Sequence, residues 1–514
     1  MSVCAVRAGE LSAAVSRAAP HADIVELRLD CLADDAELVA ALPPLDALLR
    51  ERPRPLLFTF RPAEQGGHRA LARDARLDFW TTLSKFTRER GLAPPDFVDL
   101  ELDLLEDPAS RQRLRDLLAA STVICSHHDF AGVPPDLESI YERMAATPAR
   151  VIKIAVGASD AIDCLPVFRL IERARRDGRE VIAVAMGAAG LATRVLGPAR
   201  GAFLTYAASD ETSATAPGQP TATALRETYR LDAITERTEI VGLVGSPVSH
   251  SLSPHVHNAA FAARGLDAVY LTFDVRDLDA FWTRMARPSS RREIDWPLRG
   301  LSITAPHKSA VVARLDWTEQ SACEIGAVNT VVFDGDSARG YNTDAAAALA
   351  PLAGLMKFGG ARVAVIGAGG AARSVLWSLR RAGARATVFA RDPERARALA
   401  AAFGATHARL PGAGFDGFDL VVNATPLGTR GAKQDDTPAT AGQLRGARAA
   451  YDLVYNPPET RFMREARAAR CEIVMGGLAM LIAQAVAQFK LWTGADAPAD
   501  VMWEAAERAL ARRA

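Results

Sequence analysis

Residues 361–379 read ARVAVIGAGGAARSVLWSL, a short β-branched run followed by a glycine-rich turn and a helical segment. Gly367, Gly369 and Ala372 have the GxGxx[GA] spacing, and they lie between the expected strand and the expected helix. In that position the turn is typical of a dinucleotide site, where backbone N–H groups and the positive helix end hold a pyrophosphate. A glycine-rich turn that binds nothing is the alternative. We expect a Rossmann-like domain around this stretch.

The next expected strand, residues 384–392 (ARATVFARD), indicates which dinucleotide binds. An NAD site uses an acidic residue at this strand end to hold the ribose 2′-hydroxyl. Here Arg391 lies at the tip and Arg395 follows one turn later, so a 2′-phosphate is favoured and the predicted cofactor is NADP. Asp392, directly beside Arg391, keeps NAD open as a minority alternative.

A second group of polar residues precedes this domain, between residues 246 and 344. SHSLSP supplies two hydroxyls in a proline-bracketed loop, ITAPHK ends in Lys308, and GYNTD ends in Asp344. Each piece alone suits a helix cap or a turn. Together, hydroxyls, an amide and a Lys/Asp pair suit a small polyhydroxylated carboxylate. The helical segment after Met475 is expected to fold back onto residues 239–345.

The first half of the chain has a different pattern, in which apolar strand-like runs alternate with Ala/Leu/Arg-rich helical segments. The expected strands are eight, at 2–6, 23–29, 55–60, 97–102, 122–127, 151–156, 180–186 and 202–206. Eight such strands within about 230 residues predict a (β/α)8 barrel. Their continuous rather than alternating apolar character also favours a parallel sheet covered on both sides.

Polar residues fall at the carboxyl ends of these strands, where barrel active sites lie. Lys153 lies within VIKIAV, and His128, Arg61 and Arg194 follow three other strands. Burial lowers the pKa of a lysine amine, and a neutral amine can form a Schiff base with a ketone. The histidine can move protons, and the arginines can hold a carboxylate. A structural ion pair is the alternative for a single strand lysine.

Composition is consistent with a soluble enzyme of two or three domains. The 514 residues carry a formal net charge of zero, which argues against a nucleic-acid partner. No signal peptide or membrane-length apolar run is visible, so we expect small-molecule substrates and a cytoplasmic location.

The six cysteines are scattered without a CxxC pair, which favours reduced thiols over a disulfide framework or a metal site.

The first half resembles the type I 3-dehydroquinate dehydratases over roughly residues 3–222. The matching motifs are VELRLD, TFRP with the following Gly-Gly, SHHDF, KIA, the Met186/Arg194 pair and TAPGQ. The resemblance implies that Lys153 forms an imine with 3-dehydroquinate, and that His128 is the acid–base group in the loss of water to 3-dehydroshikimate. It also implies the substrate-binding residues Glu26, Arg28, Arg61, Met186, Arg194, Thr215 and Gln219. Gln65 stands where the family usually has Glu, and Thr215 where Ser is commoner.

The second half resembles shikimate dehydrogenase over nearly all of 239–514. NATPLG, YDLVYNP and GGLAMLIAQA are further matches. The resemblance implies that NADPH reduces 3-dehydroshikimate to shikimate, with Lys308 and Asp344 as the catalytic pair. It implies shikimate contacts from Ser251, Ser253, Thr304, Asn329, Tyr455 and Gln484. It implies cofactor contacts from Gly367, Gly369, Gly370, Ala371, Arg391, Arg395, Thr425 and Gly477.

Two positions depart from the usual dehydrogenase pattern. Ser302 replaces the Asn of bacterial single-domain members, and it is the residue found in plant-type fused enzymes with this same domain order. Ala390 replaces a common Asn before the cofactor arginine.

These inferences predict an α/β protein with an N-terminal (β/α)8 barrel followed by a two-domain dehydrogenase. The predicted boundaries are 1–228 for the barrel, 229–238 for a linker, 239–345 with 478–514 for the shikimate-binding domain, and 346–477 for the NADP-binding domain. An NAD-dependent quinate/shikimate enzyme is one alternative for the second half. A non-catalytic transcriptional repressor that senses pathway intermediates is another, but it should have lost catalytic residues that this chain retains.

Overall fold

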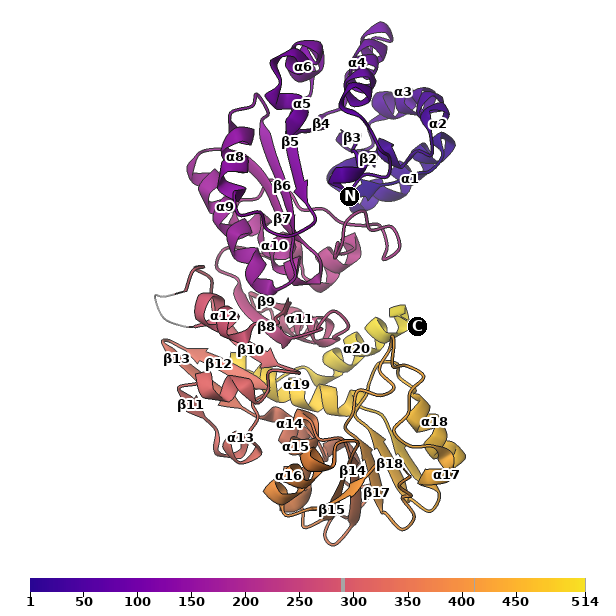
Figure 1. The fold of residues 1–514 in the computed structure, drawn as a ribbon, viewed down its shortest axis with the longest axis vertical. Coiled ribbons are helices and arrows are strands. Elements are labelled where there is room, and N and C mark those ends of the chain that lie inside the picture. The colour runs from indigo at the N-terminus through magenta and orange to yellow at the C-terminus, as the bar shows by residue number, and fades with distance from the viewer. Residues whose placement is uncertain (288–291, 411, 514) are drawn as a thin grey trace. The chain divides into compact units, whose positions relative to one another are not determined.

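The computed structural model describes residues 1–287, 292–410 and 412–513. These residues form two compact units, traced along the chain in Figure 1. The first comprises Met1–Thr238 with Leu271–Met285 and Glu293–Trp296, and the second comprises the rest of the described chain.

The first unit is built on a parallel sheet of seven strands that follow one another in chain order. They are β1 (Ser2–Val3), β2 (Val25–Arg28), β3 (Leu56–Thr59), β4 (Phe97–Glu101), β5 (Thr122–Asp129), β6 (Val151–Gly157) and β7 (Glu180–Met186). The helices are α1 (Leu11–Ala18), α2 (Asp35–Ala40), α3 (Leu42–Glu51), α4 (Arg73–Glu89), α5 (Leu102–Glu106), α6 (Pro108–Arg113), α7 (Arg115–Ala120), α8 (Leu137–Ala145), α9 (Cys164–Arg176) and α10 (Leu191–Leu196). Sequential parallel pairing with helical crossovers is the connectivity of a (β/α) barrel.

The eighth predicted strand, at residues 202–206, is not a strand in the structure. The segment still lies between the two ends of the sheet: the Phe203 N–H donates to Val181 O of β7, and Ala207 O accepts from the Ser2 N–H of β1. Because these contacts with the two neighbours are four residues apart along the chain, the segment crosses the gap obliquely. The segment therefore closes the ring of strands without pairing regularly with either neighbouring strand.

The prediction that all cysteines are free was wrong. Cys4 and Cys31 form a disulfide, whereas Cys125, Cys164, Cys323 and Cys471 are free thiols. Cys4 follows β1 and Cys31 ends a 3-10 turn (Leu29–Cys31) after β2. Since β1 and β2 are paired in parallel, their carboxyl ends are adjacent although 27 residues separate the cysteines in sequence. A spacing of 27 residues forms no short cysteine motif, so the sequence alone does not mark the pair.

The second unit contains two six-stranded sheets, and the first of them is mixed. Its order is β11-β13-β12-β10-β8-β9, with β8 (Glu239–Gly245), β9 (Ala268–Asp274), β10 (Leu298–Ile303), β11 (Trp317–Thr318), β12 (Thr330–Asp334) and β13 (Ser337–Tyr341). Helices of this region are α11 (Ser253–Ala263), α13 (Gln320–Ile325), α14 (Thr343–Ala347), α19 (Leu478–Thr493) and α20 (Ala499–Arg513). The end of β9 and the short helix α12 (Leu278–Phe281) belong to the first unit, although β9 pairs within this sheet. One apolar core joins Val241 of β8 to Phe489 of α19 and Met502 of α20. The C-terminal helices therefore pack on residues more than 200 positions earlier in the chain.

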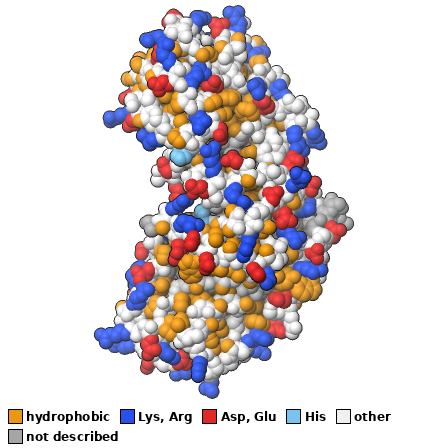
Figure 2. Space-filling view, turned by 180° about the vertical axis from the view of Figure 1, so that it is seen from behind, with side chains coloured by type: hydrophobic (Ala, Val, Ile, Leu, Met, Phe, Trp, Pro, Cys, Tyr) orange, Lys and Arg blue, Asp and Glu red, His pale blue; other side chains and the backbone are white. Residues whose placement is uncertain are grey.

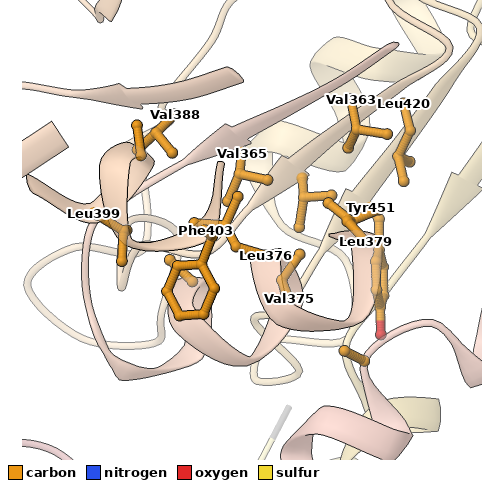
Figure 3. Packing of buried hydrophobic residues seen from close by; sticks show 14 of the residues in the cluster. Val363, Val365, Val375, Leu376, Leu379, Val388, Leu399, Phe403, Leu420 and Tyr451 are labelled. Carbon is orange, nitrogen blue, oxygen red and sulfur yellow. The ribbon is translucent and has the colours of Figure 1, made fainter. Parts of the chain in front are cut away.

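The second sheet of this unit is entirely parallel. Its order is β16-β15-β14-β17-β18-β19, with β14 (Arg362–Ile366), β15 (Arg385–Ala390), β16 (Thr406–Arg409), β17 (Leu420–Asn423), β18 (Ala449–Asp452) and β19 (Ile473–Met475). The helices are α15 (Gly370–Arg381), α16 (Pro393–Phe403), α17 (Ala441–Leu444) and α18 (Arg461–Ala468). In chain order this is 3-2-1-4-5-6, the dinucleotide-binding arrangement, in which ligands bind where the order reverses beside the first strand. Figure 3 shows Val375, Leu376 and Leu379 of α15 packed against Val363 and Val365 of β14.

The surface is charged with both signs. On the face shown in Figure 2, cationic and anionic side chains are interspersed, as expected for a net charge of zero. Among the described residues, every helix is too short or too polar to cross a lipid bilayer.

Candidate active sites

The first candidate site is a small cavity of about 50 Å³ at the carboxyl ends of the barrel strands. It brings together every predicted residue of the first half. The lining includes Glu26, Arg28, Arg61, His128, Lys153, Met186, Arg194, Thr215 and Gln219. Ser2, Gln65 and Tyr206, which were not predicted as substrate contacts, also line it.

Lys153 lies at the centre of this group and is only 5% exposed. Its Nζ donates to Asp99 Oδ2 at 2.8 Å, lies 3.9 Å from Glu26 Oε1, and sits 4.3 Å from the centre of the Tyr206 ring. Burial lowers the pKa of Lys153, and the Asp99 carboxylate opposes part of that effect while Arg61 adds to it. The lysine is thus shifted towards the neutral form that a nucleophilic amine requires.

His128 is held next to the lysine by Arg61. The Arg61 Nη1 lies 2.8 Å from His128 Nδ1, and a guanidinium can only donate, so Nδ1 accepts. Burial, reinforced by the charges of Arg61 and Lys153, lowers the pKa of His128 well below its ordinary value. The ring is therefore neutral at pH 7, with its proton on Nε2.

The two arginines predicted to hold a carboxylate differ in whether an anionic side chain already pairs with them. Arg61 already has an anionic partner, since its Nη2 donates to Asp99 Oδ2 at 2.6 Å. Arg194 is 2% exposed, its Nε has no hydrogen-bond partner among the described residues, and burial alone lowers its pKa to about 10. A buried guanidinium without a counter-ion is costly, and a bound anion would remove that cost. The geometry favours Arg194 as the carboxylate site.

The remaining predicted residues form the wall of the cavity. Gln219 Oε1 accepts from both the backbone and the hydroxyl of Thr215, at 2.8 and 3.1 Å. Gln65, the departure in the third loop, accepts from the His128 N–H at 3.3 Å. Sequence reasoning missed Asp99, whose carboxylate joins Lys153 to Arg61. The available signal was a charged residue inside the apolar run FVDLEL.

The second candidate site is a cavity of about 450 Å³ in the second unit, lined from both of its sheets. It collects the predicted substrate and catalytic residues, namely Ser251, Ser253, Thr304, Lys308, Asn329, Asp344, Tyr455 and Gln484. It also collects Ala371, Thr425 and Gly477 from the predicted cofactor set.

Lys308 and Asp344 form an ion pair in this cavity. Lys308 Nζ donates to Asp344 Oδ2 at 2.5 Å, and the other carboxylate oxygen accepts from Asn329 Nδ2 at 2.8 Å. The aspartate is thus fixed from two sides and orients the ammonium. A Cβ added at Gly370 would lie 3.2 Å from Lys308 Cδ, so the lysine passes directly beside the start of α15.

A buried polar chain lies under this pair, and sequence analysis did not predict its central member, Gln488. Tyr270 Oη donates to Ser302 Oγ at 2.7 Å, and Ser302 Oγ donates to Gln488 Oε1 at 3.1 Å. Gln488 Nε2 donates in turn to the Asn329 carbonyl at 3.2 Å. Ser302, the residue noted as a departure, therefore links the cavity wall to α19.

The predicted cofactor turn has the required backbone. Gly367 has φ of +121°, and a Cβ there would lie 2.8 Å from the Ala424 carbonyl oxygen. Gly369 precedes α15 as its N-cap, so the first N–H groups of that helix face the turn. These features fit a dinucleotide pyrophosphate.

The residues at the end of β15 bear on the choice of dinucleotide. Arg391 and Arg395 are exposed and lie outside the lining of the cavity. Asp392 Oδ1 accepts from the N–H groups of Glu394 and Arg395 as the N-cap of α16. One oxygen of the Asp392 carboxylate therefore caps this helix.

Comparisons with known proteins cover both halves. A family model described as "Type I 3-dehydroquinase" matches residues 1–236. Models described as "Shikimate dehydrogenase substrate binding domain" and "Shikimate 5'-dehydrogenase C-terminal domain" match residues 243–331 and 477–507.

Individual relatives agree with these matches. A chloroplastic bifunctional 3-dehydroquinate dehydratase/shikimate dehydrogenase of Arabidopsis thaliana is 31% identical over 512 residues, covering 94% of this chain and 79% of the relative. A shikimate dehydrogenase (NADP(+)) of Moorella thermoacetica is 42% identical over 278 residues, covering 52% of this chain and 91% of the relative. A crystal structure of a shikimate dehydrogenase in complex with NADP+ is 34% identical with a TM-score of 0.50, covering 54% of this chain and 97% of that chain.

The two resemblances expected from the sequence are thereby confirmed, as is the order of a barrel-type unit before a dehydrogenase with a Rossmann-like sheet. The chain belongs to the family of bifunctional 3-dehydroquinate dehydratase/shikimate dehydrogenases.

Proposed function

We propose that this chain converts 3-dehydroquinate to 3-dehydroshikimate in the barrel and then reduces 3-dehydroshikimate to shikimate in the second unit. The observation that carries the first reaction is that one cavity holds two buried cationic side chains, Lys153 and Arg194, and that the Arg194 Nε has no partner in the described part of the chain. Such a pair can bind the carboxylate and ketone of one small substrate.

In the dehydratase reaction, Arg194 binds the substrate carboxylate and Lys153 attacks the ketone carbon. The C–N bond forms as the ketone oxygen leaves as water, giving an imine that acidifies the neighbouring C–H bond. His128 takes up that proton and returns one to the departing hydroxyl, which leaves as a second water. Proton uptake requires the Arg61–Nδ1 contact to open, because that contact occupies the lone pair of the neutral ring. Hydrolysis of the product imine releases 3-dehydroshikimate and restores the amine.

Borohydride trapping tests this reaction directly. The full chain, incubated with 3-dehydroquinate and reduced with borohydride, should carry a covalent adduct on the peptide containing Lys153. Lys85, an exposed lysine of the same unit, is the internal control and should remain unmodified. An adduct on another lysine, or none, would contradict the Schiff-base mechanism.

In the dehydrogenase reaction, the substrate ring lies among the hydroxyls and amides of the second cavity. NADPH, when bound, supplies the hydride for the ketone carbon. Lys308 donates a proton to the developing alkoxide and stabilises its charge, and Asp344 holds the ammonium in place. Asn329 fixes the far oxygen of Asp344, so that the carboxylate does not rotate away.

We further propose that NADP is preferred over NAD, because Arg391 ends β15 while Asp392 is committed to capping α16. Steady-state assays with shikimate and quinate, each with NADP+ and NAD+, test this preference. We expect Arg391→Ala to raise the KM for NADP+ about tenfold and to leave the KM for NAD+ nearly unchanged, because the lost contact is to the 2′-phosphate alone. A wild-type preference for quinate and NAD+ would contradict the proposal.

The other finer predictions remain part of this proposal. The residue roles and the domain boundaries at 228, 238, 345 and 477 stay predictions from the sequence. The zero net charge supports small-molecule substrates without nucleic-acid or membrane partners. The cytoplasmic location stays a prediction, since the Arabidopsis relative is described as chloroplastic, and cell fractionation would test it.

A further inference from the structure

Cys4, Cys31 and His68 converge beside the dehydratase site, although the sequence analysis indicated no metal site. They follow β1, β2 and β3, three neighbouring strands whose carboxyl ends meet at one edge. Cys4 Sγ lies 3.9 Å from His68 Nε2, and the two sulfurs and one imidazole nitrogen all lie within 4.8 Å of one another. Cys4 and His68 are exposed and Cys31 is buried, so solvent reaches the group from one side.

We propose that Cys4, Cys31 and His68 form a redox-gated site for a thiophilic divalent cation, Zn²⁺, which binds when the Cys4–Cys31 disulfide is reduced. Two thiolates and an imidazole are the ligand types that Zn²⁺ prefers, at about 2.3 Å for sulfur and 2.0–2.1 Å for nitrogen. The Cα atoms of the two cysteines are 5.4 Å apart, so side-chain rotation brings both sulfurs onto one ion. Three protein ligands leave the fourth tetrahedral position to water.

The disulfide and the metal site are alternative states of the same atoms. An oxidised low-molecular-weight disulfide RSSR accepts the two electrons: two Cys thiols and RSSR give the Cys4–Cys31 disulfide and two RSH. A disulfide sulfur is not a thiolate, so this reaction removes two of the three ligands and releases the ion. Exposed Cys4 is the thiol accessible to RSSR, and buried Cys31 then resolves the mixed disulfide.

The backbone of the site is anchored to the dehydratase cavity. The His68 N–H donates to Asp30 Oδ2 at 3.1 Å, and Asp30 accepts two hydrogen bonds from the Arg28 guanidinium at 2.9 and 2.7 Å. Arg28 also donates to the Gly66 carbonyl at 3.1 Å, two residues before His68. The imidazole-bearing loop is thereby tied to the β2 strand end that carries Cys31. Because this framework already positions the ligand-bearing segments, they need little rearrangement to bind the ion.

Cobalt spectroscopy on the full chain tests the proposal. The protein is reduced with a phosphine, freed of metal with a chelator and titrated with Co²⁺. We expect a single Co²⁺ ion per chain with a thiolate-to-metal charge-transfer band and the intense d–d bands of tetrahedral coordination, both abolished by stoichiometric Zn²⁺. The same protein oxidised with glutathione disulfide should show none of these bands.

Variants separate this site from adventitious thiol binding. Cys4→Ser and Cys31→Ser should each abolish the charge-transfer band, and His68→Ala should shift the d–d bands and weaken binding at least tenfold. Cys323→Ser, at an exposed free cysteine of the second unit, is the matched control and should bind as the wild type does. Circular dichroism and the dehydratase activity report folding of the Cys4, Cys31 and His68 variants, and the dehydrogenase activity reports folding of Cys323→Ser. The proposal is overturned if the reduced wild type gives no thiolate band, if Cys4→Ser retains it, or if Cys323→Ser loses it.

Discussion

The side chains around Lys153 and Lys308 suit the two lysines to opposite tasks. Lys153 is nearly fully buried and shares its carboxylate partner, Asp99, with Arg61. Lys308 is more exposed and pairs with Asp344, whose other oxygen is held by a neutral amide. Burial and a competing cation favour a neutral amine at Lys153. At Lys308, the unshared carboxylate instead fixes the position of the side chain.

Arg194 offers the clearest single-residue test of the dehydratase site. Arg194→Ala should raise the KM for 3-dehydroquinate about ten- to hundredfold, because a hydrogen bond to a charged group contributes about 1.5–3 kcal/mol. Steady-state assays of dehydration measure the effect, and the dehydrogenase activity of the same preparation should stay unchanged. Arg150→Ala, which removes an exposed ion pair with Glu180, is the control. An unchanged KM in Arg194→Ala would remove this residue from the carboxylate site.

A site residue could be predicted from the sequence when the residues next to it form a recognisable motif. Lys153 and Lys308 lie in short motifs whose residue types already indicate chemistry. Asp99 and Gln488 act through partners 54 and 159 residues away, so nothing near them in sequence marks their role. The Cys4–Cys31 pair was missed for the same reason, since it depends on which strands are neighbours.

Among the elements, α11 makes the second unit sensitive to acid through His257. This histidine is 0% exposed and stacks on Tyr270 with ring centres 4.5 Å apart. Burial lowers the pKa of His257 to about 3. The unfolded chain binds a proton near pH 6.5 and the folded chain does not, so this contribution to stability is complete above pH 6.5 and is lost as the pH falls below it.

From pH 7 to pH 5, burial of neutral His257 should lower the free energy of unfolding by about 2 kcal/mol. We expect His257→Phe, which keeps a ring against Tyr270, to lose that part of the pH dependence. Urea denaturation at both pH values, followed by loss of dehydrogenase activity, measures the difference. The same substitution at His407, an exposed position on β16, should retain the wild-type slope. Equal slopes for His257→Phe and the wild type would show that His257 is not the group responsible.

The strand–turn–helix element at β14 and α15 makes a separate prediction. Gly367→Ala places a Cβ 2.8 Å from the Ala424 carbonyl at a φ of +121°, so the turn must distort. We expect a loss of stability of about 1–3 kcal/mol and a clear rise in the KM for NADPH, with the dehydratase unaffected. Gly414→Ala in the same domain meets no atom within 4 Å and is the control. A Gly367→Ala variant with normal NADPH kinetics would contradict the assigned turn.

The strands of the barrel were predicted correctly where apolar runs alternate regularly with helical segments. The prediction was wrong for the irregular segment that closes the barrel. Strands β2, β3, β4, β6 and β7 are buried on every residue or on all but one, and their apolar runs are visible in the sequence. The segment 202–206 is also largely apolar, yet Phe203 bonds to β7 while the bond to β1 is made by the following residue, Ala207. Apolar character predicts that a segment is buried, but it does not predict whether its backbone forms regular hydrogen bonds with a neighbouring strand.

At the scale of the whole molecule, the described residues that line each of the two cavities all belong to one unit. Lys153→Met should therefore abolish dehydration alone, and Lys308→Met should lower reduction alone by about 100-fold or more. Mixed together with 3-dehydroquinate and NADPH, the two variants should form shikimate through dehydroshikimate released into solution. The measurement is NADPH oxidation after a lag, with each variant alone as control. A mixture that forms no shikimate would mean that one site depends on the integrity of the other.

The presence of two activities on one polypeptide also fixes the ratio between them. Every ribosomal product carries one dehydratase and one dehydrogenase, so gene expression and proteolysis scale both capacities together and never change their proportion. The steady-state level of dehydroshikimate is then set by the two turnover numbers and by the NADPH supply. A lineage that needs more or less of this intermediate has to alter side chains in one of the two cavities or separate the gene.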